Sequence, residues 1–301
     1  MLGDYKAVEP ERAARIIADA AYRSLILEVC TTPKPGLVDR RNNGAHKDMD
    51  LPMFRRSAAA LRPYFLACAE AGMHYRGPAA LVRIVKLVPL GLEAEQTMYR
   101  VTGGVNTHKG AIFSLGVFCG AAGYLIQEPG IRYLSSVTRW SCALMLQDLE
   151  RADPAELAKT HGGQLFLRHG VLGIRGEAAK GYPTVYEIAM PAYLRYRAEG
   201  LPRMEAGACT LLHLISAVED TNLIARSDYQ TYVSILRETS RFLRTASSAD
   251  ILAVLPEMDD IFIKKNLSPG GSADLLAVTY FLDLLAPQLP GLHIRKRSPR
   301  D

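Results

Sequence analysis

The sequence predicts an all-α fold, a single-domain multi-helix bundle with a central polar pocket where the helices join. Apolar residues recur at the i, i+3, i+4 spacing of a helix face over most of the 301 residues. Strand signals are nearly absent, because no extended polar/apolar alternation and no Asn-Gly hairpin between β-branched runs is found. Glycines, prolines and charged residues gather between the helical runs, which favours a pocket built at the helix joints.

Each helix is predicted from its own local signals. Pro10 suits a first helical turn, and the small and apolar residues that follow it keep one face to 30. Gly72 is placed to end a second helix. In chain order, the predicted helices span 10–30, 53–71, 92–101, 109–125, 131–150, 155–160, 184–197, 203–218, 228–244, 249–265 and 273–285.

No internal repeat and no Pro/Ser-rich linker divides the chain. We therefore expect one catalytic domain over 1–301, with flexible ends at 1–8 and 293–301. The uncharged run 110–127 is about long enough for a membrane span. Its many Gly, Ala and Ser residues favour a buried central helix instead.

The composition indicates a cytoplasmic enzyme for small anionic molecules. A net charge of +5 with dispersed basic residues does not suit a nucleic-acid-binding protein. The five cysteines form no Cys-x-x-Cys pair, which is typical of buried thiols in a reducing compartment. The first residues lack the apolar region of a signal peptide, so we expect neither export nor a membrane.

Residues 32–50 form the richest joint. They hold two prolines, two glycines, four basic side chains, a histidine and the carboxylates Asp39, Asp48 and Asp50. Pro35 and Gly36 exclude a regular helix here. A stiff loop of this composition indicates a surface for an anionic ligand, with metal-binding capacity in its three aspartates.

A second joint, 103–110, precedes the uncharged helix. Asn106 or Thr107 can cap that helix and leave its first N–H groups free for an anion. Lys109 adds a charge, and Gly104 allows close backbone approach. The Gly-x4-Gly-Lys-Ser/Thr order of a Walker A loop is missing.

Three further joints carry polar residues. Arg175 and Glu177 lie between two glycines. Glu219 and Asp220 are adjacent carboxylates that repel each other unless a cation lies between them, which makes Mg²⁺ ligation plausible.

In the last joint, Gly270 and Gly271 precede a predicted helix with Ser272 as its N-cap, which forms a second helix start suited to phosphate. His46 and His108 are candidate general bases. No Ser/His/Asp triad order and no zinc spacing is found, so the residues alone indicate a Mg²⁺-assisted enzyme for polyphosphorylated substrates.

The order of these motifs resembles one family, triphosphoribosyl-dephospho-CoA synthase. The matching motifs are Thr-Pro-Lys-Pro-Gly-Leu-Val-Asp at 32–39, Gly-Ala-His-Lys-Asp-Met-Asp at 44–50, Gly-Val-Asn-Thr-His-Lys-Gly at 104–110, Arg-Gly-Glu-Ala at 175–178, Glu-Asp-Thr-Asn at 219–222 and Ser-Pro-Gly-Gly-Ser-Ala-Asp-Leu-Leu at 268–276. The resemblance covers roughly 20–285. One departure is Ser227-Asp228, where a glycine pair is expected after Arg226.

The resemblance implies a transferase that joins ATP and 3′-dephospho-CoA to give 2′-(5″-triphosphoribosyl)-3′-dephospho-CoA and releases adenine. The product would pass to an acyl carrier protein holo-transferase that serves citrate lyase or malonate decarboxylase. The resemblance leaves open whether the protein forms a homodimer. Two alternatives are a Mg²⁺-dependent N-glycoside hydrolase and a non-catalytic nucleotide- or CoA-binding accessory protein of an acyl carrier protein.

The resemblance and the joints together assign hypothetical roles. The candidate catalytic residues are Asp48, Asp50, Glu177 and His46. The candidate Mg²⁺ ligands are Asp48, Asp50, Glu219 and Asp220. The candidate substrate and phosphate ligands are Lys34, Arg40, Gly104, Asn106, His108, Lys109, Arg226, Ser268, Gly270 and Gly271.

Overall fold

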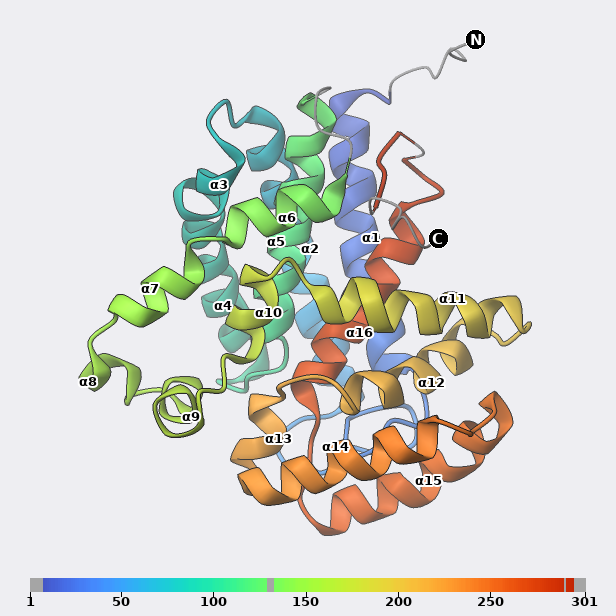
Figure 1. The fold of residues 1–301 in the computed structure, drawn as a ribbon. Coiled ribbons are helices and arrows are strands. Elements are labelled where there is room, and N and C mark those ends of the chain that lie inside the picture. Colours follow the sequence, from blue (N-terminus) through green and yellow to red (C-terminus); the bar gives the residue numbers. More distant parts are fainter. Residues whose placement is uncertain (1–7, 129–132, 290, 295–301) are drawn as a thin grey trace.

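A computed structural model describes residues 8–128, 133–289 and 291–294, and it confirms the all-α prediction (Figure 1). The helices are α1 (Pro10–Cys30), α2 (Leu51–His74), α3 (Ala79–Val82), η1 (Arg83–Leu87), α4 (Val88–Thr102), α5 (Lys109–Gln127), α6 (Leu134–Cys142), α7 (Met145–Arg151), α8 (Pro154–Leu157), α9 (His161–His169), α10 (Gly173–Ala179), η2 (Thr184–Ala189), α11 (Met190–Ala198), α12 (Arg203–Ile215), α13 (Thr221–Ala225), α14 (Tyr229–Leu243), α15 (Ser248–Lys264) and α16 (Gly270–Leu285). The elements η1 and η2 are π-helical turns that lead directly into α4 and α11.

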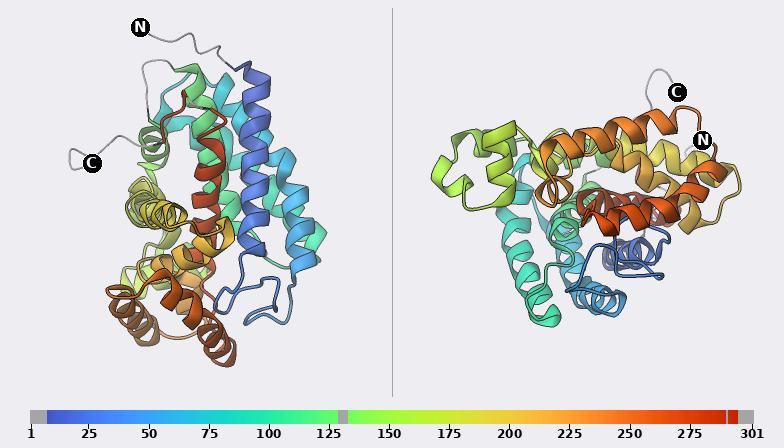
Figure 2. Two further views of the ribbon diagram at one scale, coloured as in Figure 1. Left: turned by 90° about the vertical axis from the view of Figure 1, so that its right-hand side faces the viewer. Right: turned by 90° about the horizontal axis from the view of Figure 1, so that it is seen from below.

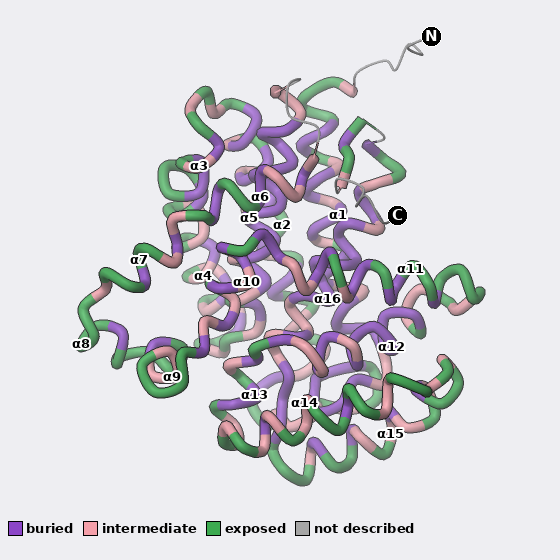
Figure 3. Tube along the Cα trace, viewed as in Figure 1, coloured by how far each residue is buried: buried purple, intermediate pink, exposed green. Residues whose placement is uncertain are grey.

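Four long helices form the centre of the molecule. Helices α1, α2, α5 and α16 pack against one another, and Figure 2 shows them running side by side. Their facing sides carry one large apolar cluster that also takes in α12 and η2. The remaining helices surround this centre, with α4 on α2, α6 on α5, and α14 and α15 on α12. Figure 3 shows the buried centre and the exposed outer helices α7, α8 and α14.

Glycines in α5 explain how it lies so close to α2. A methyl group on Gly123 would come within 2.0 Å of the Ala69 carbonyl oxygen, and one on Gly72 within 2.0 Å of the Gly120 carbonyl oxygen. The two backbones therefore touch without intervening side chains. Of the described helices, α5 is the one long and apolar enough to cross a membrane, but 78% of the relevant window is buried inside the protein. The predicted buried central helix is confirmed.

Several short helices in the polar joints escape sequence prediction. These are α3 with η1, α9, α10 and α13, and each has too few turns for a periodic apolar face to stand out. In α10, Gly173 and Gly176 also suggest a turn rather than a helix. The other predicted helices are present, with ends that differ by a few residues.

Two predicted helix boundaries are wrong. The single helix expected over 131–150 is divided into α6 and α7, and residues 131 and 132 lie outside the described residues. In α6 the hydroxyl groups of Thr138 and Ser141 donate back to carbonyls of the preceding turn, which weakens the helix near its end. Helix α16 begins at Gly270 with Pro269 as N-cap, so Ser272 lies within the first turn rather than before it.

The predicted flexible ends fall mostly outside the described residues, which exclude 1–7 and 295–301. The part that is described is attached to the molecule. The carbonyl oxygens of His293 and Ile294 accept hydrogen bonds of 2.8 and 3.1 Å from the Leu134 and Ser135 amides. The chain therefore returns to the start of α6 after α16.

We expect Gly123→Ala to lower the free energy of unfolding by about 1–3 kcal/mol, because the added methyl group must force α2 and α5 apart. The matched control is Gly162→Ala in α9, where an added methyl group meets nothing within 4 Å. That control should be neutral or slightly stabilising, since alanine is the better helix former. Urea unfolding of both variants measures the difference, and equal effects would contradict close helix contact as the cause.

Candidate functional site

The loop 31–50 is held in shape by two carboxylates. Asp39 is buried and accepts hydrogen bonds from the backbone amides of Lys34 at 3.0 Å, Arg41 at 2.6 Å and Asn42 at 3.1 Å. Asp259 of α15 accepts from the Gly36 amide at 2.9 Å and from the Asn42 side chain at 2.8 Å. The metal-binding capacity expected of Asp39 is therefore taken up by the folding of the loop itself.

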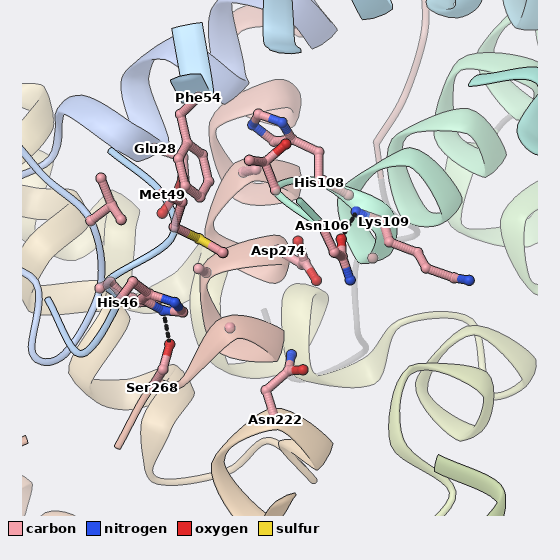
Figure 4. Close-up of a pocket in the computed structure, with 18 of the residues that line it drawn as sticks. Glu28, His46, Met49, Phe54, Asn106, His108, Lys109, Asn222, Ser268 and Asp274 are labelled. Carbon is pink, nitrogen blue, oxygen red and sulfur yellow. Dashed lines mark hydrogen bonds between the residues drawn. The ribbon is translucent and has the colours of Figure 1, made fainter. Parts of the chain in front are cut away.

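This loop covers a cavity of about 300 Å³, the inner cavity, at the ends of α1, α5, α13 and α16 (Figure 4). Much of its wall is apolar and includes the aromatic ring of Phe54. The polar residues of the lining come from every predicted joint except the one around Arg175 and Glu177, and Glu28 comes from α1. The residues that line the inner cavity are Leu25, Glu28, Lys34, Leu37, Val38, His46, Asp48, Met49, Phe54, Asn106, Thr107, His108, Lys109, Gly110, Ala111, Asn222, Arg226, Ser268, Gly270, Ala273, Asp274 and Ala277.

A larger cavity of about 630 Å³, the outer cavity, lies next to it. Helices α9, α10 and α13 supply much of its wall, and Lys109, Lys159 and Lys180 are its lysines. Both cavities are lined by the same five residues, which we name the shared wall. These residues are Asn106, Lys109, Gly110, Asn222 and Asp274. The site is thus two adjoining chambers rather than one pocket.

A buried ion pair forms one side of the inner cavity. Lys34 is 1% exposed, and its ammonium group contacts the Glu28 carboxylate, which is also buried. Burial raises the pKa of Glu28, while the charge of Lys34 opposes that shift. Lys34 therefore brings little net positive charge to the cavity, although its position in the lining agrees with the sequence prediction.

Arg226 and His46 form a second polar group on the inner cavity. The Arg226 guanidinium donates to His46 Nδ1 at 3.0 Å and to the Ala45 carbonyl at 3.0 Å. His46 Nδ1 is thus an acceptor, so Nε2 carries the proton and donates to Ser268 Oγ at 2.8 Å. Burial and the charge of Arg226 lower the pKa of His46 to about 4, against the opposing effect of Asp48. With both nitrogens engaged, His46 is a positioned neutral imidazole.

His108 is buried at the start of α5 and is held by a hydroxyl chain. Thr107 Oγ1 donates to Ser57 Oγ at 2.8 Å, and Ser57 Oγ lies 2.8 Å from His108 Nδ1. This contact holds Nδ1 of the imidazole ring in place, whichever of the two atoms carries the shared proton. The Nε2 atom of His108 has no hydrogen-bond partner among the described residues. Burial, with a further contribution from Lys34, lowers the pKa of His108 to about 3.

Asp274 lies at the centre of the site, between Met49 and Asn106 in Figure 4. Burial raises its pKa well above the ordinary range, and the negative charges of Glu28 and Asp220 raise it further. The amide of Ala111 at the start of α5 opposes the shift by a hydrogen bond to the carboxylate. Among the described residues, Asp274 is the one carboxylate that lines both cavities.

Asp48 and Asp50 have different surroundings. The Asp48 side chain is 61% exposed at the edge of the inner cavity, and its Oδ1 lies 3.8 Å from His46 Nδ1. Asp50 instead caps α2, where its Oδ1 accepts a 2.8 Å hydrogen bond from the Met53 amide. Asp50 is absent from the lining of either cavity.

The other predicted acids accept hydrogen bonds from backbone amides. Glu177 accepts from the amide and hydroxyl of Thr184 at 2.8 and 2.9 Å, and burial raises its pKa. Glu219 accepts from the Leu172 and Gly173 amides at 2.9 and 3.2 Å. Both acids line the outer cavity.

Asp220 is 1% exposed and joins two helices. It accepts from the Asn222 and Leu223 amides of α13, and from the amide and hydroxyl of Ser272 in α16. Its oxygen atoms are therefore used to join these helices. In the part of the chain that the structure describes, no group of three or more His, Cys, Asp or Glu side chains is placed to hold a metal ion.

Most predicted phosphate ligands line a cavity. The N-cap of α5 is His108 rather than the expected Asn106 or Thr107, although the Asn106 side chain accepts from the Lys109 amide at 3.1 Å. The Lys109 side chain pairs with Glu95 at 2.9 Å. Arg40 is exposed, and neither it nor Gly104 contributes to the lining.

Among the Asp, Glu, Lys and Arg residues that line the two cavities, sequence reasoning assigned no role to Glu28, Lys159, Lys180 and Asp274. Glu28 and Asp274 lie inside apolar helices, where a charged residue is a signal because burial of a charge is costly. Lys159 and Lys180 lie in turns next to short helices, where the sequence has no periodic apolar pattern.

Comparison with known proteins gives one consistent result. Residues 14–290 match the family described as ATP:dephospho-CoA triphosphoribosyl transferase. A probable 2-(5″-triphosphoribosyl)-3′-dephosphocoenzyme-A synthase of Lactiplantibacillus plantarum is 41% identical over 90% of this chain and 97% of its own length. The synthase of Klebsiella pneumoniae is 41% identical over 92% of this chain and 93% of its own. The synthase of Pectobacterium atrosepticum is 41% identical over 86% and 85%. No solved structure matches this fold significantly.

The buried neutral His108 predicts a pH dependence of stability. Its pKa is about 3 in the folded protein and near 6.5 when unfolded, so between these values the unfolded chain binds a proton that the folded protein does not. The stabilising effect of the neutral His108 is complete above pH 6.5 and is lost as the pH falls from 6.5 toward 3. We expect wild type to lose about 2 kcal/mol of unfolding free energy between pH 7 and pH 5 relative to His108→Asn.

Urea unfolding at both pH values measures this difference. The exposed His74→Asn at the end of α2 is the control and should follow wild type. Parallel curves for wild type and His108→Asn would show that His108 is protonated as readily in the folded protein as in the unfolded chain.

Proposed function

The chain belongs to the ATP:dephospho-CoA triphosphoribosyl transferase family, and from this premise we propose that its two adjoining cavities hold the two substrates of the family reaction. The protein is a transferase that joins ATP and 3′-dephospho-CoA to give 2′-(5″-triphosphoribosyl)-3′-dephospho-CoA and releases adenine. The observation that carries the proposal is the shared wall, because a reaction between two bound molecules needs one place where both are within reach.

The outer cavity suits the triphosphate of ATP. Three lysines line it, and ammonium groups bind phosphate as compact point charges. Lys159 and Lys180 are exposed, and Lys109 reaches the cavity from the start of α5. Lys109 and Lys159 pair with Glu95 and Glu156 in the free protein, so a bound phosphate exchanges these partners for its own oxygens.

The inner cavity suits the adenosine end of dephospho-CoA. Leu37, Met49 and Phe54 offer an apolar wall for a flat base. Arg226 at the same cavity offers a guanidinium group for the diphosphate. The 2′-hydroxyl of the ribose, which lies between base and diphosphate, then comes to the shared wall. A hydroxyl there faces the ribose of the ATP bound on the other side.

The Mg²⁺ requirement stays a prediction. Three of the acids expected as ligands, Asp50, Glu219 and Asp220, accept hydrogen bonds from backbone amides. Mg²⁺ usually keeps most of its water and binds through one or two carboxylates together with substrate phosphates. We therefore propose that any Mg²⁺ enters with the triphosphate, where it would supply charge neutralisation during binding.

The predictions about partners, location and oligomeric state that accompany the resemblance also stand. The product would pass to an acyl carrier protein holo-transferase that serves citrate lyase or malonate decarboxylase. A cytoplasmic location and the choice between monomer and homodimer remain predictions as well.

Chromatography of adenine release from ATP separates the family reaction from the two alternatives. We expect release only when dephospho-CoA is also present, since the nucleophile is its hydroxyl group. Equal release without dephospho-CoA would indicate an N-glycoside hydrolase. Binding of both nucleotides without any adenine, with or without added Mg²⁺, would indicate a non-catalytic accessory protein.

Substitutions confined to one cavity test the assignment of the substrates. Lys180→Ala should raise the KM for ATP at least about fivefold and leave the KM for dephospho-CoA unchanged, because one charge-assisted contact is lost. Arg226→Ala should raise the KM for dephospho-CoA and leave the KM for ATP unchanged. The control Lys86→Ala, an exposed lysine in η1, should behave as wild type. If Lys180→Ala affected dephospho-CoA alone, the assignment of the two cavities would have to be exchanged.

A further inference from the structure

The reaction needs a group that accepts a proton at the place where the two substrates meet. The nucleophile is a ribose hydroxyl, which is a poor nucleophile until its proton is transferred to a base. Two histidines line the site, but His46 uses both of its nitrogens, and burial lowers the pKa of His108 to about 3, which makes its imidazole a weak base. Neither imidazole therefore takes up this proton readily, so the base is sought among the carboxylates.

The carboxylates of the two cavities differ in how fully they are engaged. Glu28 is paired with Lys34 in the inner cavity, and Asp48 lies at its exposed edge. In the outer cavity, Glu177 and Glu219 each accept two hydrogen bonds from fixed donors of the protein. Each of these four acids lines one cavity only, whereas Asp274 lines both.

A second observation indicates that a ligand belongs beside Asp274. The inner cavity is also lined by His108, whose Nε2 is buried and has no partner among the described residues. A buried polar atom without a partner costs about 1–3 kcal/mol, which favours a role in contacting a bound molecule. Asp274 and His108 thus bring a carboxylate and an unpartnered ring nitrogen to the lining of the same chamber.

We propose that Asp274 is the catalytic base that accepts the proton of the 2′-hydroxyl of dephospho-CoA at the shared wall. This inference rests on the proposed function. As the proton moves to the carboxylate, the hydroxyl oxygen forms a bond to C1′ of the ATP ribose. The bond from C1′ to the adenine nitrogen breaks, and its electron pair leaves with adenine. Adenine then takes up one proton, which Asp274 can return, so atoms and charges balance over the cycle.

The surroundings of Asp274 suit this role. An ordinary aspartate is a weak base, because its pKa lies far below neutral pH. Burial, Glu28 and Asp220 all shift the pKa of Asp274 upward, which makes its carboxylate a stronger base than that of an ordinary aspartate.

Because Gly110 has no side chain, it leaves the space that the Asp274 carboxylate occupies. An added methyl group on Gly110 would lie 1.9 Å from Asp274 Oδ2 and 3.4 Å from Oδ1, so the carboxylate would have to move away. Gly110 does not have a positive φ angle, and alanine suits a helix at this position. Gly110→Ala is thus a way to displace the base without removing it.

The first experiment replaces the carboxylate. We expect Asp274→Asn to lower kcat at least about 10²-fold, because general-base catalysis typically contributes 10²–10⁴-fold. The dissociation constants of ATP and dephospho-CoA, measured by calorimetry, should change little. Asp274→Ala should be equally slow and should regain part of its kcat with added formate, which restores a carboxylate in the vacated space. The surface variant Glu257→Gln should match wild type with or without formate.

The second experiment displaces the carboxylate. Gly110→Ala should lower kcat at least about tenfold, again with ordinary circular dichroism and thermal unfolding. If Asp274→Asn kept kcat within about threefold of wild type, Asp274 would not be the base. Slow turnover of Asp274→Ala that formate leaves unchanged would also overturn the proposal. Loss of binding of both substrates in folded Asp274→Asn would make it a binding residue instead.

Failure of the proposed function would look different. In that case wild type itself would release no adenine in response to dephospho-CoA, or Lys180→Ala and Arg226→Ala would leave both KM values unchanged. The two sets of measurements therefore separate an incorrect base from an incorrect arrangement of substrates.

Discussion

Backbone amides at the helix joints have to be satisfied inside this protein, and buried carboxylates satisfy many of them. The first turn of every helix presents N–H groups without partners in the helix. Asp220 meets this demand for α13 and α16 together, Asp39 orders the loop 31–50, and Asp259 fixes that loop to α15. Because these acids position the joints, they help to position the side chains that the joints bring to the two cavities.

The same requirement sorts the acids of the site by role. A carboxylate that accepts several amides is fixed and has little capacity for a proton or a metal ion. Asp274 differs, since its burial beside Glu28 and Asp220 makes its negative charge costly. Several acids of the joints thus serve as structural acceptors, whereas Asp274 is the one for which we propose a catalytic role. The close packing of α2 and α5 supports this arrangement by fixing the start of α5 against the joint.

The sequence predicted the fold class, and most of the predicted site residues line one of the cavities, since long periodic helices and polar joints are visible in the order of residues alone. It could not show that Asp50 caps α2 or that Asp220 bridges two helices, because a free carboxylate and a capping carboxylate look alike in a sequence. It also treated Ser272 as a cap, because the glycines before it resemble a turn. Asp274 was missed since its motif drew attention to glycines, although its place inside an apolar helix was a signal. Its contact with both cavities, which only the structure shows, sets it apart from the other acids.

A wall that serves two chambers limits how such an enzyme can evolve. A substitution at Asn106 or Asn222 alters the surroundings of both substrates at once, so a gain for one is tied to a change for the other. Phe54 and Lys180 each belong to a single chamber and are free of that link. New substrate preferences should therefore arise first at such single-chamber positions. Substitutions at the shared positions should accumulate more slowly, because each must be compatible with both substrates.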